Sequence, residues 1–411
     1  MAASELTYAP QAHSSSAKEV SVSKSGLKIA QVATSDLSVR VLLMNQIKVL
    51  QRQGHEVVAV CAPGPWVESL RNEGVPVELV KMARELNPVR DLFSLLKLIR
   101  CFRKYNFDVV HTHTPKAGLL GPIAAKLAGV PVVVHTIHGL LFHDGMPRWK
   151  RLLYWFPEKI TAAFSDLLLS QSLEDVSVAQ HSGLCSAAKI NYLGNGIEVS
   201  KFSSSETSRE RHLARRELGI LDTDIVIGSV GRLVYDKGFG ELFAAASQLV
   251  QKHKDLKFII IGPEEPDQRD AVRKSEIEAL SRTGSVFFLH WRDDLSRWYA
   301  TMDMFVLPSH REGVPRACME ASAMGVPVIT TNIRGCREVV KPNETGILVP
   351  VKDCEALIVA IESLVCDESK RIRLGREGRR HILKNFDQEL VVERLRSFYS
   401  TIQLRIQAAK S

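Results

Sequence analysis

The stretch MFVLPSHREGVPRACMEASAMGVPVITT, residues 304–331, predicts a strand, a tight turn, a helix and a second strand. Its two ends are short apolar runs, which are typical of buried parallel strands. In the turn, Gly313 permits a sharp bend, Val314 is pushed into an extended conformation by the next residue, and Pro315 suits the first position of a helix. The helix would cover 316–324, because a glycine follows it. Such a strand–helix–strand unit indicates an α/β fold with parallel strands.

Two glutamates lie on either side of this turn. Glu312 is in the loop before the helix, and Glu320 is inside the helix, just over one turn from its start. Between them, the exposed N–H groups near Val314, Arg316 and Ala317 make an anion site at the helix N-terminus. A sugar diphosphate could bridge the two carboxylates. A helix cap and a surface glutamate are the simpler alternative, and this stretch alone leaves both open.

The same alternation of apolar runs and amphipathic segments occurs in two series along the chain. A charged, serine-rich stretch at 200–216 separates the two series. The expected strands are 28–34, 55–63, 75–80, 107–114, 130–138 and 166–172, and then 225–232, 257–262, 286–291, 304–309, 326–331 and 346–351. The pattern predicts two doubly wound halves that join near 196–206, with ligands beyond the carboxyl ends of the strands, in the cleft between the halves.

Composition excludes several classes of protein. The 411 residues carry a net charge of +8, and 27–195 hold 19 Lys and Arg against 13 Asp and Glu. We find no interleaved arginine and aromatic stretch and no DNA-binding motif, so nucleic acid is not expected as a partner. The seven cysteines are scattered and indicate free thiols in a reducing compartment. No apolar run is long enough to span a membrane. Residues 1–26 read as a disordered tail rather than a secretory signal.

A basic loop opens the second half. In SVGRLVYDKGFGEL (229–242), Gly231 lets the backbone bend after a strand, and Arg232 and Lys237 follow it. Arginine can grip phosphate oxygens with two hydrogen bonds, and lysine acts as a point charge. The loop lacks the P-loop pattern. A solvated basic turn remains the simpler alternative.

Four histidines follow two neighbouring strands, in HTHTPKAG (111–118) and HTIHGLLF (135–142). A zinc site is disfavoured, because the ligands would come from alternating strand faces and no Cys or HExxH lies nearby. We expect His111 and His135 to be packed strand residues. His138 would lie in a loop that reaches the cleft, with its imidazole donating to a substrate hydroxyl.

Taken together, Gly231-Arg232…Lys237-Gly238, the Glu-x7-Glu of Glu312 and Glu320, and Thr136-Ile137-His138-Gly139 resemble a known family. They are similar to the retaining nucleotide-sugar glycosyltransferases of the "group 1" family, glycosyltransferase family 4. That family has the GT-B fold, in which two Rossmann-like domains face a central cleft. The resemblance covers about residues 27–400 and is closest to enzymes of bacterial surface polysaccharide, lipopolysaccharide and lipid-linked oligosaccharide synthesis that use UDP-sugars.

The resemblance assigns roles residue by residue. It implies that Arg232 and Lys237 bind the diphosphate and offset the charge of the leaving group, that Glu312 lies by the donor sugar, and that Glu320 holds the ribose hydroxyls. The catalytic candidates are therefore Glu312, His138, Arg232 and Lys237, and the donor-binding candidates are Arg232, Lys237, Gly231, Gly313, Val314, Pro315, Arg316, Glu320 and His290, the last from the Leu289–Trp291 edge beside the nucleobase.

The resemblance also implies how the chain is divided into domains, and the sequence departs from the family pattern at one loop. After the tail, it implies an acceptor-binding domain at 27–200, a nucleotide-sugar domain at 201–385, and a helix at 386–411 that crosses back to the first domain. Many members have a Gly-Gly loop after the first strand, whereas 33–38 here reads ATSDLS. We still expect Ser35 to Ser38 to face the acceptor or the diphosphate.

No metal and no cofactor are expected. Asp222-Thr223-Asp224 matches the metal-binding DxD of another glycosyltransferase fold, but it precedes the first strand of a half, at the wrong end for ligand binding. We interpret it as a turn. The cations at 232 and 237 and the helix N-terminus would then stabilise the developing charge, with the nucleoside diphosphate sugar as substrate.

The acceptor is the open question. Segment 147–164, PRWKRLLYWFPEKITAAF, places aromatic and basic residues together in the more basic half. It suits either an anionic membrane surface or a core-packed helix. The membrane alternative favours a saccharide or polyprenyl-diphosphate-linked saccharide acceptor. The protein is expected to be cytoplasmic, and on the membrane alternative peripheral on the inner face of the plasma membrane. A nucleotide-sugar epimerase or hydrolase, or a non-catalytic sugar-nucleotide-binding protein, remain alternatives on the same scaffold.

Overall fold

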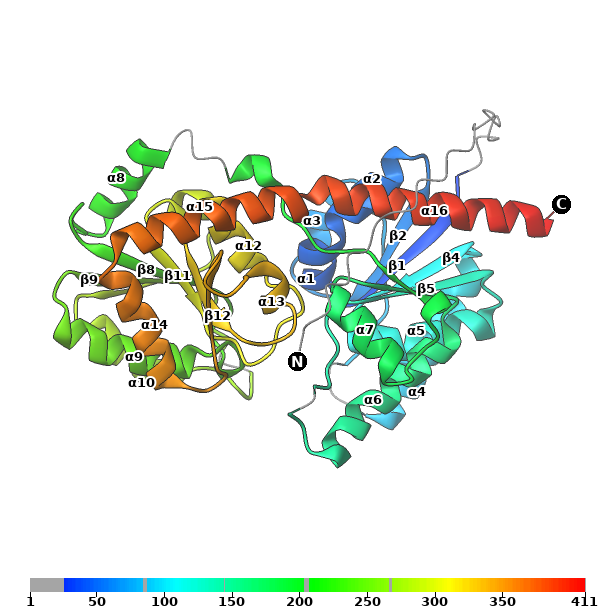
Figure 1. Ribbon diagram of the computed structural model, residues 1–411. Helices are drawn as coiled ribbons and strands as arrows, with labels where there is room; N and C mark the ends of the chain where they lie inside the picture. Colours follow the sequence, from blue (N-terminus) through cyan, green and yellow to red (C-terminus); the bar gives the residue numbers. More distant parts are fainter. Residues whose placement is uncertain (1–25, 84–86, 144, 203–206, 266–267, 411) are drawn as a thin grey trace, which may run out of the picture.

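The computed structural model describes residues 26–83, 87–143, 145–202, 207–265 and 268–410. The tail expected at 1–26 therefore lies almost wholly outside the described residues. Two parallel sheets form the centres of the two halves (Figure 1). The inner strands of both sheets are short, mainly apolar runs that are buried on both faces, as parallel strands covered by helices must be.

The first sheet has seven strands in the order β3-β2-β1-β4-β5-β6-β7. Its central strand β1 pairs in parallel with β2 and β4, so that Gln31 lies beside Ala59 on one side and His111 on the other. The strands are β1 (Lys28–Ser35), β2 (Glu56–Ala62), β3 (Val77–Leu79), β4 (Val109–Thr112), β5 (Val132–Ile137), β6 (Leu167–Ser170) and β7 (Ile190–Tyr192).

The second sheet has six strands in the order β10-β9-β8-β11-β12-β13. They are β8 (Ile225–Val230), β9 (Leu256–Ile261), β10 (Val286–Leu289), β11 (Met304–Leu307), β12 (Val328–Thr331) and β13 (Gly346–Val349). In both sheets the strand order reverses direction beside the first strand, and ligands of such sheets bind at that reversal. The expected fold class, α/β with two doubly wound domains, is confirmed.

Helices cover both faces of each sheet. In the first half they are α1 (Asp36–Ser38), the π-helical η1 (Val39–Leu43), α2 (Met44–Arg52), α3 (Val67–Asn72), α4 (Pro88–Tyr105), α5 (Pro115–Ala128), α6 (Arg148–Phe164), α7 (Leu173–His181), and the short 3₁₀ turns η2 (Ala187–Lys189) and η3 (Val199–Lys201). In the second half they are α8 (Thr207–Glu217), the 3₁₀ turn η5 (Tyr235–Lys237), α9 (Phe239–Lys252), α10 (Lys274–Ser281), α11 (Leu295–Tyr299), α12 (Arg316–Ala323), α13 (Cys336–Val339), α14 (Cys354–Val365) and α15 (Glu368–Asn385).

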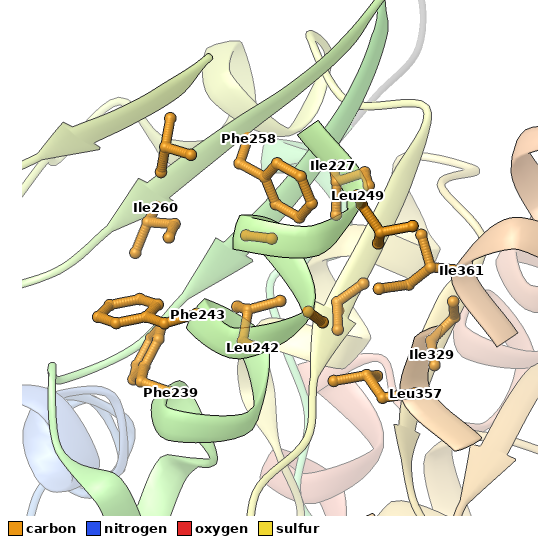
Figure 2. Packing of buried hydrophobic residues seen from close by; sticks show 14 of the residues in the cluster. Ile227, Phe239, Leu242, Phe243, Leu249, Phe258, Ile260, Ile329, Leu357 and Ile361 are labelled. Atoms are coloured by element: carbon orange, nitrogen blue, oxygen red, sulfur yellow. The ribbon is translucent and has the colours of Figure 1, made fainter. Parts of the chain in front are cut away.

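Each half has its own hydrophobic core. Figure 2 shows the core between α9 and the second sheet, where Phe239, Leu242 and Phe243 of the helix pack beside Phe258 and Ile260 of β9. Phe239 and Leu242 are fully buried. The three helical residues are three, one and four positions apart, which places them on one face of α9.

The last helix, α16 (Gln388–Lys410), lies on the first half (Figure 1). Its buried residues recur at intervals of three and four and belong to the core around β1 and β2: Val392, Leu395, Tyr399, Ile402 and Ile406. The preceding α15 packs on α12 and α14 of the second half. The chain thus crosses from the second half back to the first within a few residues after Asn385.

Candidate active site

A cavity of about 260 Å³ lies between the two halves. From the first half it is lined by residues after β4, by the end of β5 and the loop that follows, and by one residue of α6. From the second half it is lined by the loops after β8 and β11. Five of the predicted site residues line it: His138, Arg232, Lys237, Glu312 and Gly313. Segments that are up to about 200 residues apart in sequence therefore meet at one place, at the carboxyl ends of both sheets.

The turn after β11 has the predicted geometry. Helix α12 begins at Arg316 and its last residue is Ala323, and Gly325 after it has a positive φ of 79°. Glu312 lies in the loop, where it accepts a hydrogen bond from Ser309 at 2.7 Å and forms an ion pair with Lys237 at 2.6 Å. The Glu312 side chain is only 9% exposed. Two predicted site residues, one from each loop, are therefore paired with each other at the wall of the cavity.

The loop after β8 holds the two predicted cations at the cavity. Lys237 ends the turn η5, and Gly238 follows with φ 75°. A Cβ at Gly238 would lie 2.0 Å from the carbonyl oxygen of Pro308, so only glycine allows this loop to pack against the β11 loop. Arg232 is half-exposed and pairs with Glu265 at 3.2 Å. Its guanidinium thus lies at the solvent side of the cavity, where a charged ligand can displace the weak ion pair.

Glu320 lies inside α12 and is 9% exposed. It accepts a hydrogen bond from the Tyr299 hydroxyl at 3.0 Å, and Arg316 is 3.8 Å away. Burial raises the pKa of the Glu320 carboxyl, and Arg316 partly opposes this. The predicted position, one turn inside the helix, is confirmed, but Glu320 does not line the cavity.

Several predicted donor-binding residues lie near the cavity without lining it. Val314 and Pro315 are buried, and the Val314 carbonyl accepts a hydrogen bond from the Asn195 side chain at 3.0 Å. His290 is exposed just after β10, at the same edge of the sheet but two strands away from β8. Six of the predicted donor-binding residues do not line the cavity: Gly231, Val314, Pro315, Arg316, Glu320 and His290.

The backbones of the two halves touch at one point beside the cavity. A Cβ on Gly139 (φ 123°) would lie 2.8 Å from Gly313 Cα, and a Cβ on Gly313 would lie 2.1 Å from the His138 carbonyl oxygen. Neither position has room for a side chain. The predicted His138-Gly139 loop therefore packs directly on the predicted Gly313 turn.

Three of the four histidines, His111, His113 and His135, are buried beside this contact, and His138 is partly exposed. His111 is fully buried and His135 is 4% exposed, which confirms that they are packed strand residues. His138 lines the cavity, and its Nε2 lies 3.1 Å from Nδ1 of His113. Burial lowers the pKa of His138 to about 4 and that of His135 to about 3, so these imidazoles are neutral at neutral pH.

Sequence reasoning missed Glu158, a residue of α6 that lines the cavity. It is 9% exposed, and burial together with the charge of Asp175 raises its pKa to about 7. The signal was the helical period: Glu158 precedes Thr161 and Ala162 by three and four residues, and these two are buried. That spacing places Glu158 on the inner face of the helix. The aromatic residues nearby in the sequence drew attention to the opposite, exposed face.

Sequence reasoning also missed the polar contacts across the two halves. Arg334 pairs with Asp175 at 2.8 Å and donates to the Phe142 carbonyl, and its guanidinium lies 5.9 Å from the centre of the Phe142 ring. Glu338 accepts hydrogen bonds from the Ser172 hydroxyl and, at 3.1 Å, from the Glu174 amide. These contacts join the N-terminus of α7 to α13 and hold the cavity walls at their present separation.

The loop after β1 does not reach the cavity. Ser35 and Ser38 are hydrogen-bonded to each other at 2.9 Å, and Asp36 to Ser38 form the short helix α1. Asp36 is buried and accepts a hydrogen bond from the Trp66 amide at 2.7 Å. The expectation that Ser35 to Ser38 face the acceptor or the diphosphate is thus not supported by the residues that line the cavity.

Asp222 and Asp224 lie in a turn before β8, as expected. Asp222 pairs with His212 at 2.9 Å, and Asp224 accepts a hydrogen bond from the Leu221 amide. Across the ranges that the structure describes, no group of three His, Cys, Asp or Glu side chains could hold a metal ion. In those same ranges, none of the helices has both the length and the apolar character required to cross a membrane.

Comparisons with known proteins agree with this architecture. Residues 210–381 match the family model "Glycosyl transferases group 1", and residues 39–196 match "Glycosyl transferase 4-like domain". A capsular polysaccharide biosynthesis glycosyltransferase, CapM of Staphylococcus aureus, is 33% identical over 380 residues, which are 91% of this chain and 97% of that protein.

A second curated relative and a solved structure are also similar to this chain. A UDP-Gal:α-D-GlcNAc-diphosphoundecaprenol α-1,3-galactosyltransferase of Escherichia coli is 28% identical, with 91% of this chain and 97% of that protein covered. Among solved structures, Anabaena Alr3699/HepE in complex with UDP and glucose superposes with a TM-score of 0.76 at 20% identity, with 91% and 99% covered. The chain therefore belongs to the "glycosyl transferases group 1" family and is a glycosyltransferase with the GT-B fold, of the kind that builds bacterial polysaccharides and lipid-linked sugars.

Proposed function

We propose that this protein transfers a hexose or N-acetylhexosamine from a UDP-sugar, with retention at the anomeric carbon, to a saccharide or polyprenyl-diphosphate-linked acceptor. The observation that carries the proposal is the cavity between the halves, where Arg232, Lys237 and Glu312 of the second half face His138 of the first. The relatives named for undecaprenyl-diphosphate acceptors support the acceptor class, and the neighbour bound to UDP and glucose supports the donor class.

The second half supplies the positive charge that a departing diphosphate needs. Lys237 is paired with Glu312 at 2.6 Å, and Arg232 lies at the outer side of the cavity. The N-terminus of the eight-residue helix α12 lies beside the same turn. When the bond between the anomeric carbon and the diphosphate breaks, these groups stabilise the charge on the leaving oxygen. Glu320, buried one turn further, is the candidate for the ribose hydroxyls.

Retention follows most simply from attack on the same face. Among the described residues that line the cavity, three carry carboxyl groups, Glu158, Asp236 and Glu312, and Glu312 is held by Lys237 and Ser309. A carboxylate in two such bonds is a poor nucleophile. We therefore favour a path in which the acceptor oxygen bonds to the anomeric carbon as the diphosphate leaves, and the proton of the acceptor hydroxyl passes to the departing phosphate oxygen. A trapped glycosyl–Glu312 adduct with a fluorinated donor would contradict this path.

The acceptor side carries an exposed apolar surface. On α6, Trp149, Leu152, Leu153 and Phe156 are 56–65% exposed, whereas Trp155 turns inward to the core around Phe142. The helix therefore packs on the core with one face, through Trp155 and Ala162, and exposes this stripe on the other. The neighbouring α4 has a stripe with the same spacing, three, four and seven residues after its first member: Val89, Leu92, Phe93 and Leu96, 44–66% exposed.

These two stripes suit an anionic lipid surface. Helix α5 packs against both α4 and α6, so the two helices that carry the stripes belong to one layer of the first half. Basic residues flank them: Arg148, Lys150, Arg151 and Lys159 on α6, and Arg90, Lys97, Arg100, Arg103 and Lys104 on α4. Apolar side chains that enter the headgroup region, with cations around them, bind anionic bilayers. A lipid-linked acceptor would then enter the cleft from the membrane.

Co-sedimentation with phosphatidylglycerol vesicles tests the docking. We expect Trp149→Ser with Leu152→Ser and Phe156→Ser to abolish binding, because all three side chains are exposed and available to a bilayer. The matched control replaces Val359 and Ile372, exposed apolar residues of the second half, by serine. Equal binding of both variants would exclude this surface as the docking site.

The transfer itself is tested with radiolabelled UDP-galactose, UDP-N-acetylglucosamine and GDP-mannose, incubated with bacterial lipid extract. We expect label from one UDP-sugar to move to the organic phase, and Lys237→Ala to abolish the transfer. The control Lys252→Ala removes a lysine that pairs with Glu362 on the far side of the second half. Isomerised donor, or free sugar without any acceptor, would instead identify an epimerase or a hydrolase.

A further inference from the structure

A row of hydrogen bonds runs from the last helix to the cavity. Gln31 of β1 links the Tyr399 hydroxyl, 3.2 Å from its Nε2, to His113, whose Nε2 lies 2.6 Å from Gln31 Oε1. Nδ1 of His113 lies 3.1 Å from Nε2 of His138. We refer to Tyr399, Gln31, His113 and His138 as the histidine relay. Its first three members are fully buried, and its last member lines the cavity.

The imidazoles in this region are uncharged. Burial lowers the pKa values of His111 and His113 well below the ordinary value, and neighbouring imidazoles lower them further. A neutral imidazole has one N–H donor and one bare acceptor nitrogen. Each ring in the relay can therefore donate only once, and the direction of one bond fixes the direction of the next.

The amide of Gln31 fixes the first direction. Its oxygen faces His113 and accepts only, so Nε2 of His113 carries the proton. Nδ1 of His113 is then bare and accepts from Nε2–H of His138. On the other side, the amide nitrogen of Gln31 donates to the Tyr399 oxygen, which leaves the Tyr399 hydroxyl hydrogen for Nδ1 of His111, 2.9 Å away. Every bond in the row has a donor and an acceptor.

The end of the row is Nδ1 of His138. This atom is buried, and its geometry to the other described residues gives it no hydrogen bond. The side chain of Gln171, which follows β6, lies close enough to the His138 ring to raise its pKa against the effect of burial. Because Nε2 carries the proton, Nδ1 is bare and can only accept. We propose that Tyr399, Gln31 and His113 are positioning residues that hold His138 as its Nε2–H tautomer, and so leave Nδ1 as the acceptor for a hydroxyl of the bound sugar.

The contact between His138 and a sugar hydroxyl rests on the proposed function, whereas the tautomer of His138 does not depend on it. This inference also reverses the expectation from the sequence that the His138 imidazole donates to a substrate hydroxyl. The hydrogen-bond partner of one ring nitrogen of a histidine determines whether the other nitrogen carries the proton. For His138, the row of partners leads through His113 and Gln31 to Tyr399 of α16. The crossing helix thus reaches the cavity through the Tyr399 hydroxyl, as well as completing the core with its apolar residues.

Nuclear magnetic resonance of protein labelled with ¹⁵N-histidine tests the tautomer without any substrate. We expect His138 to show a protonated Nε2 and a bare Nδ1 in the wild type, with its signals assigned by their loss in His138→Gln. In Tyr399→Phe the ring remains but the Gln31 amide loses its acceptor, so we expect a mixture of the two His138 tautomers. A wild-type His138 with a protonated Nδ1 would overturn the proposal, whether or not the protein has transferase activity.

Kinetics with UDP-galactose and UDP-N-acetylglucosamine test the consequence. We expect Tyr399→Phe to lower kcat by about tenfold, as for one lost hydrogen bond, with the KM for the donor unchanged. The control Tyr105→Phe removes one hydroxyl, which bonds to Glu78 in the same half, away from the relay. An equal loss in both variants, or a Tyr399→Phe enzyme with normal kcat and a mixed tautomer, would contradict the role in positioning. A wild type that shows the expected tautomer but uses neither donor would instead count against the proposed function alone.

Discussion

Glu158 combines burial, a place at the cavity wall and a raised pKa. Its carboxyl titrates near pH 7 in the folded protein, whereas an unfolded glutamate titrates near pH 4.5. The folded state therefore binds more protons between these values, and stability is lost as pH rises from about 4.5 to about 7. The charge that faces Glu158 from α7 is that of Asp175, which itself pairs with Arg334.

Glu158→Gln should remove this dependence. The two proteins should have similar stability at pH 4, and the variant should be more stable at pH 8 by up to about 3 kcal/mol, the equivalent of the shift in pKa. Urea unfolding at both pH values measures the difference. If the wild type and Glu158→Gln unfold with the same pH dependence, the Glu158 carboxyl is not protonated in the folded protein at neutral pH.

Gly313 is the residue at which the two halves meet most closely. A methyl group there would lie 2.1 Å from the His138 carbonyl oxygen, so Gly313→Ala must move the His138 loop away from the Glu312 turn. A displacement of about 1 Å at a reacting centre costs on the order of a hundredfold in rate, and we expect that loss in kcat. Binding of UDP, measured by calorimetry, separates this effect on the two halves from a loss of donor binding at Gly313 itself, which is one of the donor-binding candidates.

The control for that substitution is Gly145→Ala. Gly145 is exposed, and its added Cβ would make only ordinary contacts with His143. Its activity should equal that of the wild type. If Gly313→Ala retains full kcat, the contact between the halves is not part of the active arrangement.

At the scale of elements, α16 connects the stability of the first half to the end of the chain. Leu395 is 1% exposed in the core around β1, so Leu395→Ala should lower the free energy of unfolding by about 2–5 kcal/mol. Hydrogen exchange should rise in β1 and β2 and stay unchanged in β8 and β9. Leu404, on the same helix and 57% exposed, is the control and should change stability by less than about 0.5 kcal/mol. Equal effects at the two positions would mean that α16 does not pack as described.

The elements were predictable from the sequence where local rules decide them. The strands are short apolar runs between turn residues, and the β11–α12 turn is set by Gly313 and Pro315 within a few positions of each other. The sequence did not reveal that Glu158 faces inward. Helix α6 has apolar or aromatic residues on both its inward face and its exposed face, so their spacing does not show which face is buried. Tyr399 and His111 are 288 residues apart, and no local pattern indicates such a pairing.

At the scale of the whole molecule, two ion pairs of different burial join the halves. The Arg334–Asp175 pair is buried, with side chains 14% and 4% exposed, whereas those of Arg337 and Glu174 are 38% and 33% exposed. A double-mutant cycle with Arg334→Met and Asp175→Asn should give a coupling energy of about 1–3 kcal/mol. The matching cycle with Arg337→Met and Glu174→Gln should give about 0–1 kcal/mol, because solvent screens that pair. Equal couplings would show that burial does not distinguish the two contacts.

The proposed transfer requires a nucleotide-sugar donor in the second half and a lipid-linked acceptor in the first. Release of nucleoside diphosphate from a panel of UDP-, GDP- and ADP-sugars, with and without bacterial lipid extract, measures both requirements at once. We expect release from one UDP-sugar that depends on the extract and is lost in Glu320→Ala. Release that needs no extract, or that persists in Glu320→Ala, would contradict the account.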